Sequence, residues 1–318
     1  MSGHKNSKAG ANAMHAHLKT ALIAAALLIG PAVQAADAPS VKPAFAQGSM
    51  NVYRRFAPAD RDRMVAFYDK VLGLKSLSPI NLGGGQQMIL FGIGGGQIKL
   101  ASGLKDGRQY HVGGVNEATG IRLFTLHYPD EAALTARFVA AGYPAPAFKD
   151  VGGGQRAALA ADPAGFPLEL VIVPGAAPEA IAGVEVGINV SDLKRSEAFY
   201  RDFAGLDEAP PVKDALLGVT KHPFRHGQTT VNLWSVGKGL PADTGSAGIQ
   251  YVISNIDAVN AEAQARHITV ETPLGGLPGF NVRTVWLNDP DGVTDYFYEL
   301  GARPAGAPAT PPPPSASH

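Results

Sequence analysis

The sequence predicts an α+β fold built from four copies of a β-α-β-β-β module. Two phrases that each occur twice support this prediction. AFYDKVLGL starts at Ala66 and AFYRDFAGL at Ala198, while DPAGFPLELV starts at Asp162 and DPDGVTDYFYEL at Asp289. Both pairs are about 130 residues apart, as expected for a duplicated unit. Helix-like stretches occur once in each quarter. Strands and helices do not alternate along the chain, which argues against a parallel α/β sheet.

The repeated phrases predict their own local structure. Apolar residues at i, i+3, i+4, i+7 and i+8 from Met64 form one stripe of a helix. Gly73 and Gly205 are expected to end two helices in the left-handed conformation that glycine adopts without steric cost. Each Asp-Pro-x-Gly sequence is expected to form a type I turn that opens an apolar strand.

Hydrophobic periodicity then places the remaining elements. Helices are expected near residues 60–72, 130–141, 192–204 and 257–266. Strands are expected at Met88 to Phe91, Gln97 to Ala101, Arg122 to His127, Ala157 to Ala160, Val184 to Val190, Thr229 to Val236, Gln250 to Ser254 and Val282 to Leu287.

Composition limits the classes of partner. Lys+Arg and Asp+Glu are equal at 27, the formal net charge is zero, and no basic cluster is present, which argues against a nucleic-acid partner. The chain has no cysteine, so it has neither disulfides nor thiol chemistry.

The N-terminus predicts export. Lys19 precedes the apolar run from Ala21 to Val33, and a small-residue cleavage site follows at Ala35, so residues 1–35 are expected to be a signal peptide. The expected localisation is periplasmic or secreted. An apolar run of about 13 residues is too short to span a bilayer, so no stable membrane insertion is expected after cleavage. Translation from Met1 and from Met14 both remain open. Residues 36–48 are expected to be a linker and residues 303–318 a proline-rich, disordered tail.

The helix phrase AFYxxxxGL and the DPxG strand phrase resemble the vicinal oxygen chelate (VOC) superfamily, which includes glyoxalase, bleomycin resistance and extradiol dioxygenase-like proteins. The resemblance covers residues 49–175 and 183–302. It implies two VOC domains, each of paired βαβββ modules that form a cupped mixed β-sheet, with a ligand in the cup.

The resemblance also implies where metal ligands would lie, on the first and last strands of each module. In the first half these points are Tyr53, Leu123 or Ile121, Lys99 or Ala101, and Glu169. In the second half they are Glu185, Asn232, the segment Gly248 to Gln250, and Tyr296. The histidines that the family carries on its first strands are absent. A divalent metal is therefore possible as a cofactor but is not supported by the ligand pattern, and we assign no residue to a metal.

Two groups of residues are candidate ligand sites. The cup of the second half is expected to hold Glu185, Asn232, Trp234 and Tyr296. The rival cup, in the first half, would hold Tyr53, Arg55, His127 and Glu169.

Two of these side chains have alternative roles. Glu185 either binds a cationic or hydroxylated ligand, acts as a base, or pairs with an arginine across the sheet. His127 either completes a metal site or caps the turn at Tyr128-Pro129.

The segment KHPFRHG contains a further pair of histidines. His222 and His226 have metal-like spacing, but Pro223 argues against the helix that would bring them together. A polar loop is expected here, in which Lys221 and Arg225 could bind an anionic ligand.

The function predicted from these observations is that of an exported two-domain VOC protein that binds a small organic molecule in a β-sheet cup, without the usual family metal site. The alternative is a lyase, isomerase or dioxygenase of VOC type with an atypical divalent-metal site. A structural or interaction module is a third possibility. The sequence does not identify the ligand.

Overall fold

The computed structural model describes residues 41–83, 86–177, 181 and 183–301, which belong to one compact unit. The leader expected at 1–35 and the tail expected at 303–318 lie outside the described residues. No helix in the described part of the chain has the length and apolar character needed to cross a bilayer.

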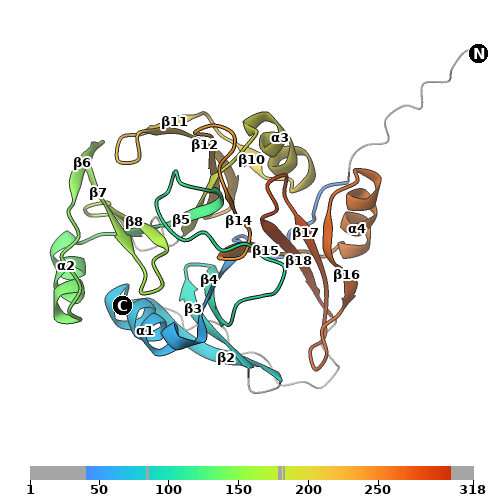
Figure 1. Cartoon of the computed structure of the whole chain (residues 1–318), viewed down its shortest axis with the longest axis horizontal. Helices are drawn as coiled ribbons and strands as arrows, with labels where there is room; N and C mark the ends of the chain where they lie inside the picture. Colours follow the sequence, from blue (N-terminus) through green and yellow to red (C-terminus); the bar gives the residue numbers. More distant parts are fainter. Residues whose placement is uncertain (1–40, 84–85, 178–180, 182, 302–318) are drawn as a thin grey trace, which may run out of the picture. The chain divides into compact units, whose positions relative to one another are not determined.

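Four modules follow one another along the chain (Figure 1). Module 1 contains β1 (Asn51–Phe56), the 3-10 turn η1 (Pro58–Asp60), α1 (Arg61–Ala66), the π-helical turn η2 (Phe67–Val71), β2 (Lys75–Gly83), β3 (Gln86–Ile93) and β4 (Gly96–Ser102). Module 2 contains β5 (Thr119–Tyr128), α2 (Glu131–Ala140), β6 (Lys149–Gly152), β7 (Gln155–Ala161) and β8 (Pro167–Ile172).

The second half repeats this order. Module 3 contains β9 (Val184–Asn189), α3 (Leu193–Ala198), the π-helical turn η4 (Phe199–Phe203), β10 (Asp207–Glu208), β11 (Val212–Asp214), β12 (Val219–His226) and β13 (Thr229–Trp234). After the short strand β14 (Ala242–Asp243), module 4 contains β15 (Ala247–Val252), α4 (Ile256–Ala265), β16 (Val270–Gly276), β17 (Val282–Asn288) and β18 (Thr294–Leu300). All four expected helices and all eight expected strands are present.

The two copies of the AFY phrase end their helices in the same way. In each, the last turn widens to a π-helix, with Leu72 N–H donating to Phe67 O and Ala204 N–H donating to Phe199 O, both at 2.9 Å. Gly73 and Gly205 follow with φ of 70° and 74°. The left-handed glycine caps predicted from the sequence are therefore confirmed.

Two mixed β-sheets form the framework. One has eight strands in the order β16-β17-β18-β15-β1-β4-β3-β2, and the other has the main order β10-β12-β13-β9-β5-β8-β7-β6. Within every module the first strand pairs in parallel with the last, as in β1 with β4 and β5 with β8. This parallel closure of each βαβββ module, together with the antiparallel pairs around it, confirms the predicted α+β fold class.

The modules do not pair as the sequence halves suggested. β1 of module 1 runs antiparallel to β15 of module 4, and β5 of module 2 runs antiparallel to β9 of module 3. Each sheet therefore contains one module from each half of the chain. The expectation that modules 1 and 2 share one sheet and modules 3 and 4 the other is therefore wrong, because all four first strands can offer an edge and their choice of partner is non-local.

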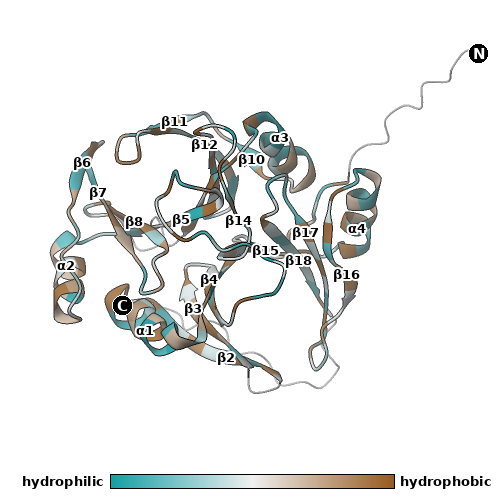
Figure 2. Ribbon diagram, in the orientation of Figure 1, coloured by the Kyte–Doolittle hydropathy of each residue, from teal (hydrophilic) through white to brown (hydrophobic). Residues whose placement is uncertain are grey.

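Strand alternation separates a core face from a cup face in both sheets. On β5, Phe124 and Leu126 are buried in the hydrophobic core, while Thr125 and His127 face the other way into a cavity. The helices α3 and α4 carry both hydrophilic and hydrophobic colours, as expected for elements that cover a core with one side (Figure 2).

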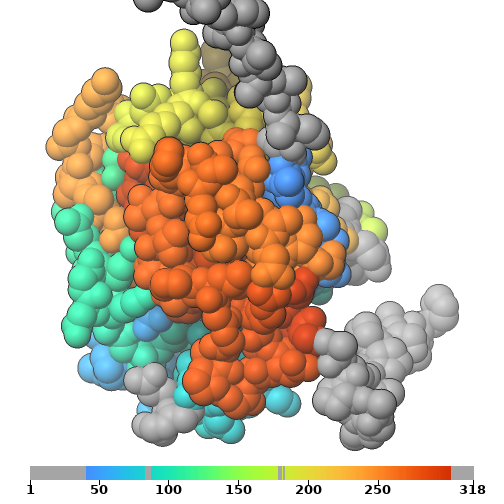
Figure 3. Space-filling view, turned by 90° about the vertical axis from the view of Figure 1, so that its right-hand side faces the viewer, coloured from blue at the N-terminus to red at the C-terminus, as the bar shows by residue number. Residues whose placement is uncertain are grey.

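Residues 41–48, expected to be part of a linker, are held against module 4. Ala46 N–H donates to Val252 O and Ser254 N–H donates to Ala44 O, each at 2.9 Å. Phe45 also contacts His226 of module 3, with 4.0 Å between the centroids of the two tilted rings. Figure 3 shows this blue segment directly beside the orange atoms of module 4. The linker prediction is therefore corrected for residues 41–48, which form an ordered segment packed against the sheet.

Candidate functional site: two cups of different polarity

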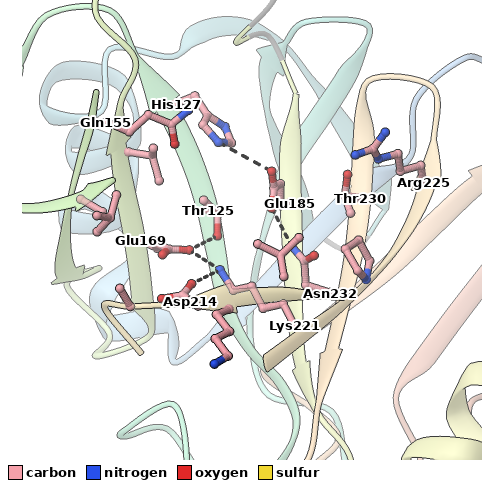
Figure 4. Close-up of a pocket in the computed structure, with 17 residues that line it drawn as sticks. Thr125, His127, Gln155, Glu169, Glu185, Asp214, Lys221, Arg225, Thr230 and Asn232 are labelled. Atoms are coloured by element: carbon pink, nitrogen blue, oxygen red, sulfur yellow. Dashed lines mark hydrogen bonds and ion pairs between the residues drawn. The ribbon is translucent and has the colours of Figure 1, made fainter. Parts of the chain in front are cut away.

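The sheet of modules 2 and 3 carries a polar cavity of about 290 Å³, which we call the polar cup (Figure 4). Its polar lining consists of Thr125, His127, Gln155, Glu169, Glu185, Lys213, Asp214, Lys221, Arg225, Thr230 and Asn232.

A buried ion triad lies on one side of the polar cup. Lys221 Nζ lies 2.8 Å from Glu169 Oε2 and 2.5 Å from Asp214 Oδ2. Thr125 Oγ1 donates to the same Glu169 oxygen at 2.7 Å. Glu169 is 3% exposed and Lys221 is 8% exposed, so the three charges depend on one another for compensation.

Burial and charge act in opposite directions on the pKa values in this triad. Burial would lower the pKa of Lys221, but the charges of Glu169 and Asp214 raise it above its ordinary value. For Asp214, burial is outweighed by the charge and hydrogen bond of Lys221, which lower its pKa. Burial raises the pKa of Glu169 in spite of the attraction to Lys221. Lys221 is thus a fixed ammonium at neutral pH.

The opposite side of the cup holds a carboxylate that is partly open to the cavity. Glu185 Oε2 accepts a hydrogen bond from Asn232 Nδ2 at 2.6 Å, and Glu185 Oε1 lies 3.6 Å from His127 Nε2. Burial lowers the pKa of His127, with Glu185 acting in the opposite direction. Among the described residues, Glu185 makes no ion pair with an arginine, which was one of its alternative roles. His127 faces the cup rather than capping the turn at Tyr128-Pro129, so that prediction is corrected too.

The KHPFRHG segment is strand β12 and not the expected polar loop. Because side chains alternate along a strand, Lys221 and Arg225 face the polar cup. His222 Nδ1 instead lies 2.8 Å from Glu197 Oε1, and His226 packs on Phe45. The two histidines have separate partners and do not form a metal site.

The sheet of modules 1 and 4 carries a larger cavity of about 440 Å³, which we call the aromatic cup. Its lining consists of Tyr53, Arg55, Ile80, Leu82, Met88, Leu90, Gln97, Lys99, Gln250, Leu277, Phe280, Val282, Trp286, Tyr296, Tyr298 and Leu300. This lining contains two cations and no carboxylate.

Lys99 is the most unusual side chain in the aromatic cup. It is 7% exposed, and no carboxylate lies within ion-pair distance of it among the described residues. Its Nζ lies 5.4 Å from the centroid of the Tyr298 ring. Burial lowers the pKa of Lys99 to about 8. The side-chain oxygen of Gln250 is also buried without a hydrogen-bond partner in the described structure.

Aromatic rings form one wall around Lys99. The rings of Trp286 and Tyr296 meet edge to face at 5.1 Å, and the Tyr296 and Tyr298 centroids are 5.3 Å apart. Burial raises the pKa of Tyr298 to about 12, so its hydroxyl stays neutral. Its oxygen accepts a hydrogen bond from Asn51 Nδ2 at 3.0 Å. The wall presents flat apolar surface with fixed polar edges.

The structure regroups the residues selected from the sequence. Glu185, Asn232, His127 and Glu169 come together in the polar cup, and Tyr53, Arg55 and Tyr296 in the aromatic cup. The prediction that Glu185, Asn232, Trp234 and Tyr296 line one cavity is wrong, because Tyr296 lies in the other sheet. Trp234 lines neither cup: it is 1% exposed, and its Nε1 donates to Asn116 Oδ1 at 3.0 Å.

Several lining residues were not selected from the sequence. Thr125, and not Leu123 or Ile121, is the first-strand residue that lies beside both Glu169 and Glu185 in register. The two-residue period of β5 places Thr125 on the same face as His127 and could have revealed it. Trp286 follows in the same way from the alternation of β17. Asp214 lies in a short strand that carries no comparable signal.

The residues present do not fit the metal site of the resembled family. The ligand points of the aromatic cup are Tyr53, Lys99, Gln250 and Tyr296, with neither histidine nor carboxylate. In the polar cup, Glu169 is already bound to an ammonium and Glu185 to an amide. No group of three or more histidine, aspartate or glutamate side chains in the described part of the chain could hold a metal ion.

Known proteins share this architecture. Residues 55–170 match the Glyoxalase/Bleomycin resistance protein/Dioxygenase superfamily. Glyoxalase I from Zea mays is 21% identical, with a TM-score of 0.60, covering 79% of this chain and 92% of the maize chain. A putative dioxygenase from Bacillus subtilis is 15% identical, with a TM-score of 0.55, covering 80% and 86%. No curated protein sequence matches the chain. At these identities, the two structures establish similarity of fold.

Proposed function

We propose that this chain is an exported member of the vicinal oxygen chelate superfamily whose aromatic cup binds a small organic anion without a metal, a proposal supported by the family match over residues 55–170 and by the fold shared with glyoxalase I. The observation that carries the proposal is Lys99, a buried ammonium without a carboxylate partner in an apolar cavity of about 440 Å³. A buried charge without a partner is costly, so an incoming anion would gain the pairing energy that the protein leaves open.

The lining of the aromatic cup defines the class of ligand. Lys99 and Arg55 supply positive charge, and no acidic side chain lines the cavity. The rings of Trp286, Tyr296 and Tyr298 offer a wall for a flat apolar body. Gln250 has a free acceptor that suits a hydroxyl or amide hydrogen on the ligand. An aromatic or similarly flat monocarboxylate meets these requirements.

Matched acid and amide probes test this proposal. We expect benzoate and indole-3-acetate to bind more tightly than benzamide and indole-3-acetamide, measured by calorimetry and by the fluorescence of Trp286. Lys99→Met should reduce the affinity for the acids by roughly 10- to 100-fold, because a hydrogen bond to a charged group contributes about 1.5–3 kcal/mol. Lys213→Met, which alters a lysine of the polar cup, is the matched control and should bind the acids normally. Equal affinity for acid and amide would contradict the proposal.

The pH dependence of binding supplies a second readout. Because the pKa of Lys99 in the empty cup is about 8, its ammonium fraction falls as the pH rises from 7 to 9. Affinity for the carboxylates should fall over the same range, while affinity for the amides should stay level. In Lys99→Arg, whose guanidinium remains charged, the dependence on pH should disappear. A wild-type affinity that does not change between pH 7 and 9 would speak against an ion pair with Lys99.

Export rests on the leader sequence. The apolar run from Ala21 to Val33 and the cleavage site at Ala35 support a mature chain that begins at Ala36 in the periplasm or outside the cell. Mass spectrometry of the periplasmic fraction should identify Ala36 as the first residue of the mature chain. Recovery of the intact chain from the membrane fraction would refute export by this route.

A further inference from the structure

In the polar cup, the ammonium of Lys221 lies between two buried carboxylates, where a metal ion could otherwise lie. Lys221 on β12 contacts Glu169 on β8 and Asp214 on β11, and Thr125 on β5 donates a hydrogen bond to Glu169, so side chains from four strands meet in one cluster (Figure 4). Glu169 is the carboxylate expected at the last-strand ligand point of module 2. Its register partner Thr125 also lies beside Glu185, the first-strand point of module 3.

We propose that the ammonium of Lys221 takes the place of a divalent cation in the polar cup. Without a positive charge, Glu169 and Asp214 would be two buried carboxylates facing each other, which is strongly unfavourable. A metal would resolve this through coordination, and here Lys221 does so through hydrogen bonds at 2.8 and 2.5 Å. This inference concerns the polar cup alone and is independent of anion binding in the aromatic cup.

An ammonium differs from a divalent ion in ways that set the chemistry of the cup. It carries a single charge and three N–H donors, two of which are directed to Glu169 and Asp214. The lysine stem is covalently fixed, so no ion can be lost to a chelator. The polar cup should therefore keep its structure in metal-free solution and should not gain stability from added metal.

The alternative is an ordinary buried salt bridge that is unrelated to a metal position. The two readings differ in what happens when the ammonium is removed. An ordinary salt bridge predicts a loss of stability that no small ion specifically repairs. A replaced cation predicts that the vacated space between Glu169 and Asp214 accepts a divalent ion, because carboxylate oxygens are ligands for such ions.

Truncation of Lys221 tests the inference. The probes are Mn²⁺, Zn²⁺ and methylammonium, added to untagged mature protein after treatment with a chelator. The wild-type midpoint of thermal unfolding should not rise with any of them. Lys221→Ala should unfold at a temperature several degrees lower. Mn²⁺ or Zn²⁺ should restore most of the loss and bind with one-to-one stoichiometry in calorimetry, and methylammonium should restore part of it.

Two further variants locate the effect. Glu169→Gln in the Lys221→Ala background should abolish the metal-dependent recovery, while Lys213→Ala, at the same cup, should behave as the wild type does. If Lys221→Ala does not fold in chelated buffer, refolding with Mn²⁺ or Zn²⁺ present decides the matter: recovery of folded protein supports the inference, and failure with every divalent ion overturns it. The inference is also overturned if folded Lys221→Ala protein shows no rise in its unfolding midpoint with either divalent ion. The same holds if the rise persists when Glu169→Gln is added.

Discussion

Single glycines allow large side chains to line or support the cups. A Cβ atom on Gly248, in β15, would meet the ring of Tyr53, which lines the aromatic cup. A Cβ on Gly187, in β9, would meet Leu123 and would lie 2.8 Å from Trp234. Neither glycine is needed for a left-handed backbone, because neither has positive φ. They are required because rings from neighbouring strands occupy the space above them.

Gly248→Ala should therefore damage the aromatic cup. We expect a loss of about 1–3 kcal/mol in the free energy of unfolding, because a methyl group in filled space displaces its neighbours. We also expect weaker binding of the carboxylate probes, since the Tyr53 ring must move. The control is Gly276→Ala in β16, where the nearest atom lies 3.8 Å from the new Cβ. Urea unfolding and calorimetry measure both effects, and equal stability of the two variants would refute the steric explanation.

At the scale of elements, each Asp-Pro-x-Gly turn is joined to the tyrosine of an AFY helix. Asp162 accepts hydrogen bonds from Ala164 and Phe166 N–H groups, and Asp289 does the same for Asp291 and Val293. Tyr68 O–H donates to Asp162 at 3.4 Å, and Tyr200 O–H donates to Asp289 at 3.1 Å. The two phrases that reveal the repeat in the sequence therefore contact each other in the fold.

The two turns differ in charge compensation. Asp162 pairs with the buried Arg54, whose Nε lies 2.8 Å from its carboxylate. No cation pairs with Asp289 among the described residues, and it lies close to Asp295, since Tyr200 contacts both carboxyl groups. Burial raises the pKa of Asp289 to about 7. The native state therefore keeps a proton that the unfolded chain loses above pH 3.8, and stability should fall as the pH rises from about 4 to about 7.

Asparagine at the two positions should give opposite outcomes. Asp162→Asn leaves Arg54 buried without its counter-charge and should cost about 3–5 kcal/mol. Asp289→Asn keeps the acceptor for the turn and removes a carboxylate that ionises at a cost. It should reduce the loss of stability with rising pH, and at pH 8 it should be as stable as the wild type or more so. Urea unfolding at pH 5, 6, 7 and 8 tests both. A wild-type stability that rises through this range would contradict the raised pKa.

At the scale of the whole molecule, local features were predictable and non-local ones were not. Gly73 and Gly205 were placed correctly because a helix cap depends on neighbouring residues. The strand β12 was missed because Pro223 and two histidines obscure its alternation, although Phe224 is fully buried. Which residues share a cup depends on the pairing of β1 with β15 and of β5 with β9, strands far apart in sequence and all rich in buried residues. The sequence therefore predicts one cavity for Tyr296 and Glu185, whereas in the structure Tyr296 lies in one sheet and Glu185 in the other.

This pairing makes the two halves of the chain depend on each other. In isolation, residues 41–175 would leave β1 and β5 each without the neighbour that they have in the intact protein, and residues 183–301 would leave β9 and β15 in the same state. These strands lie in the middle of their sheets, and most of their residues are buried in the intact protein. In an isolated half their edges would be exposed, with unpaired backbone N–H and C=O groups.

We therefore expect each half, expressed alone, to self-associate, as measured by sedimentation, and to lack binding of the carboxylate probes. Co-expression of the halves should give a one-to-one complex that recovers both the near-ultraviolet circular dichroism of the intact protein and the Lys99-dependent binding. Residues 41–175 contribute Lys99 and Tyr53 to the aromatic cup, whereas Trp286 and Tyr296 come from the other half. A stable, folded monomer of residues 41–175 would mean that β1 can pair with β5 directly, and would show that the interleaved sheets are not required for folding.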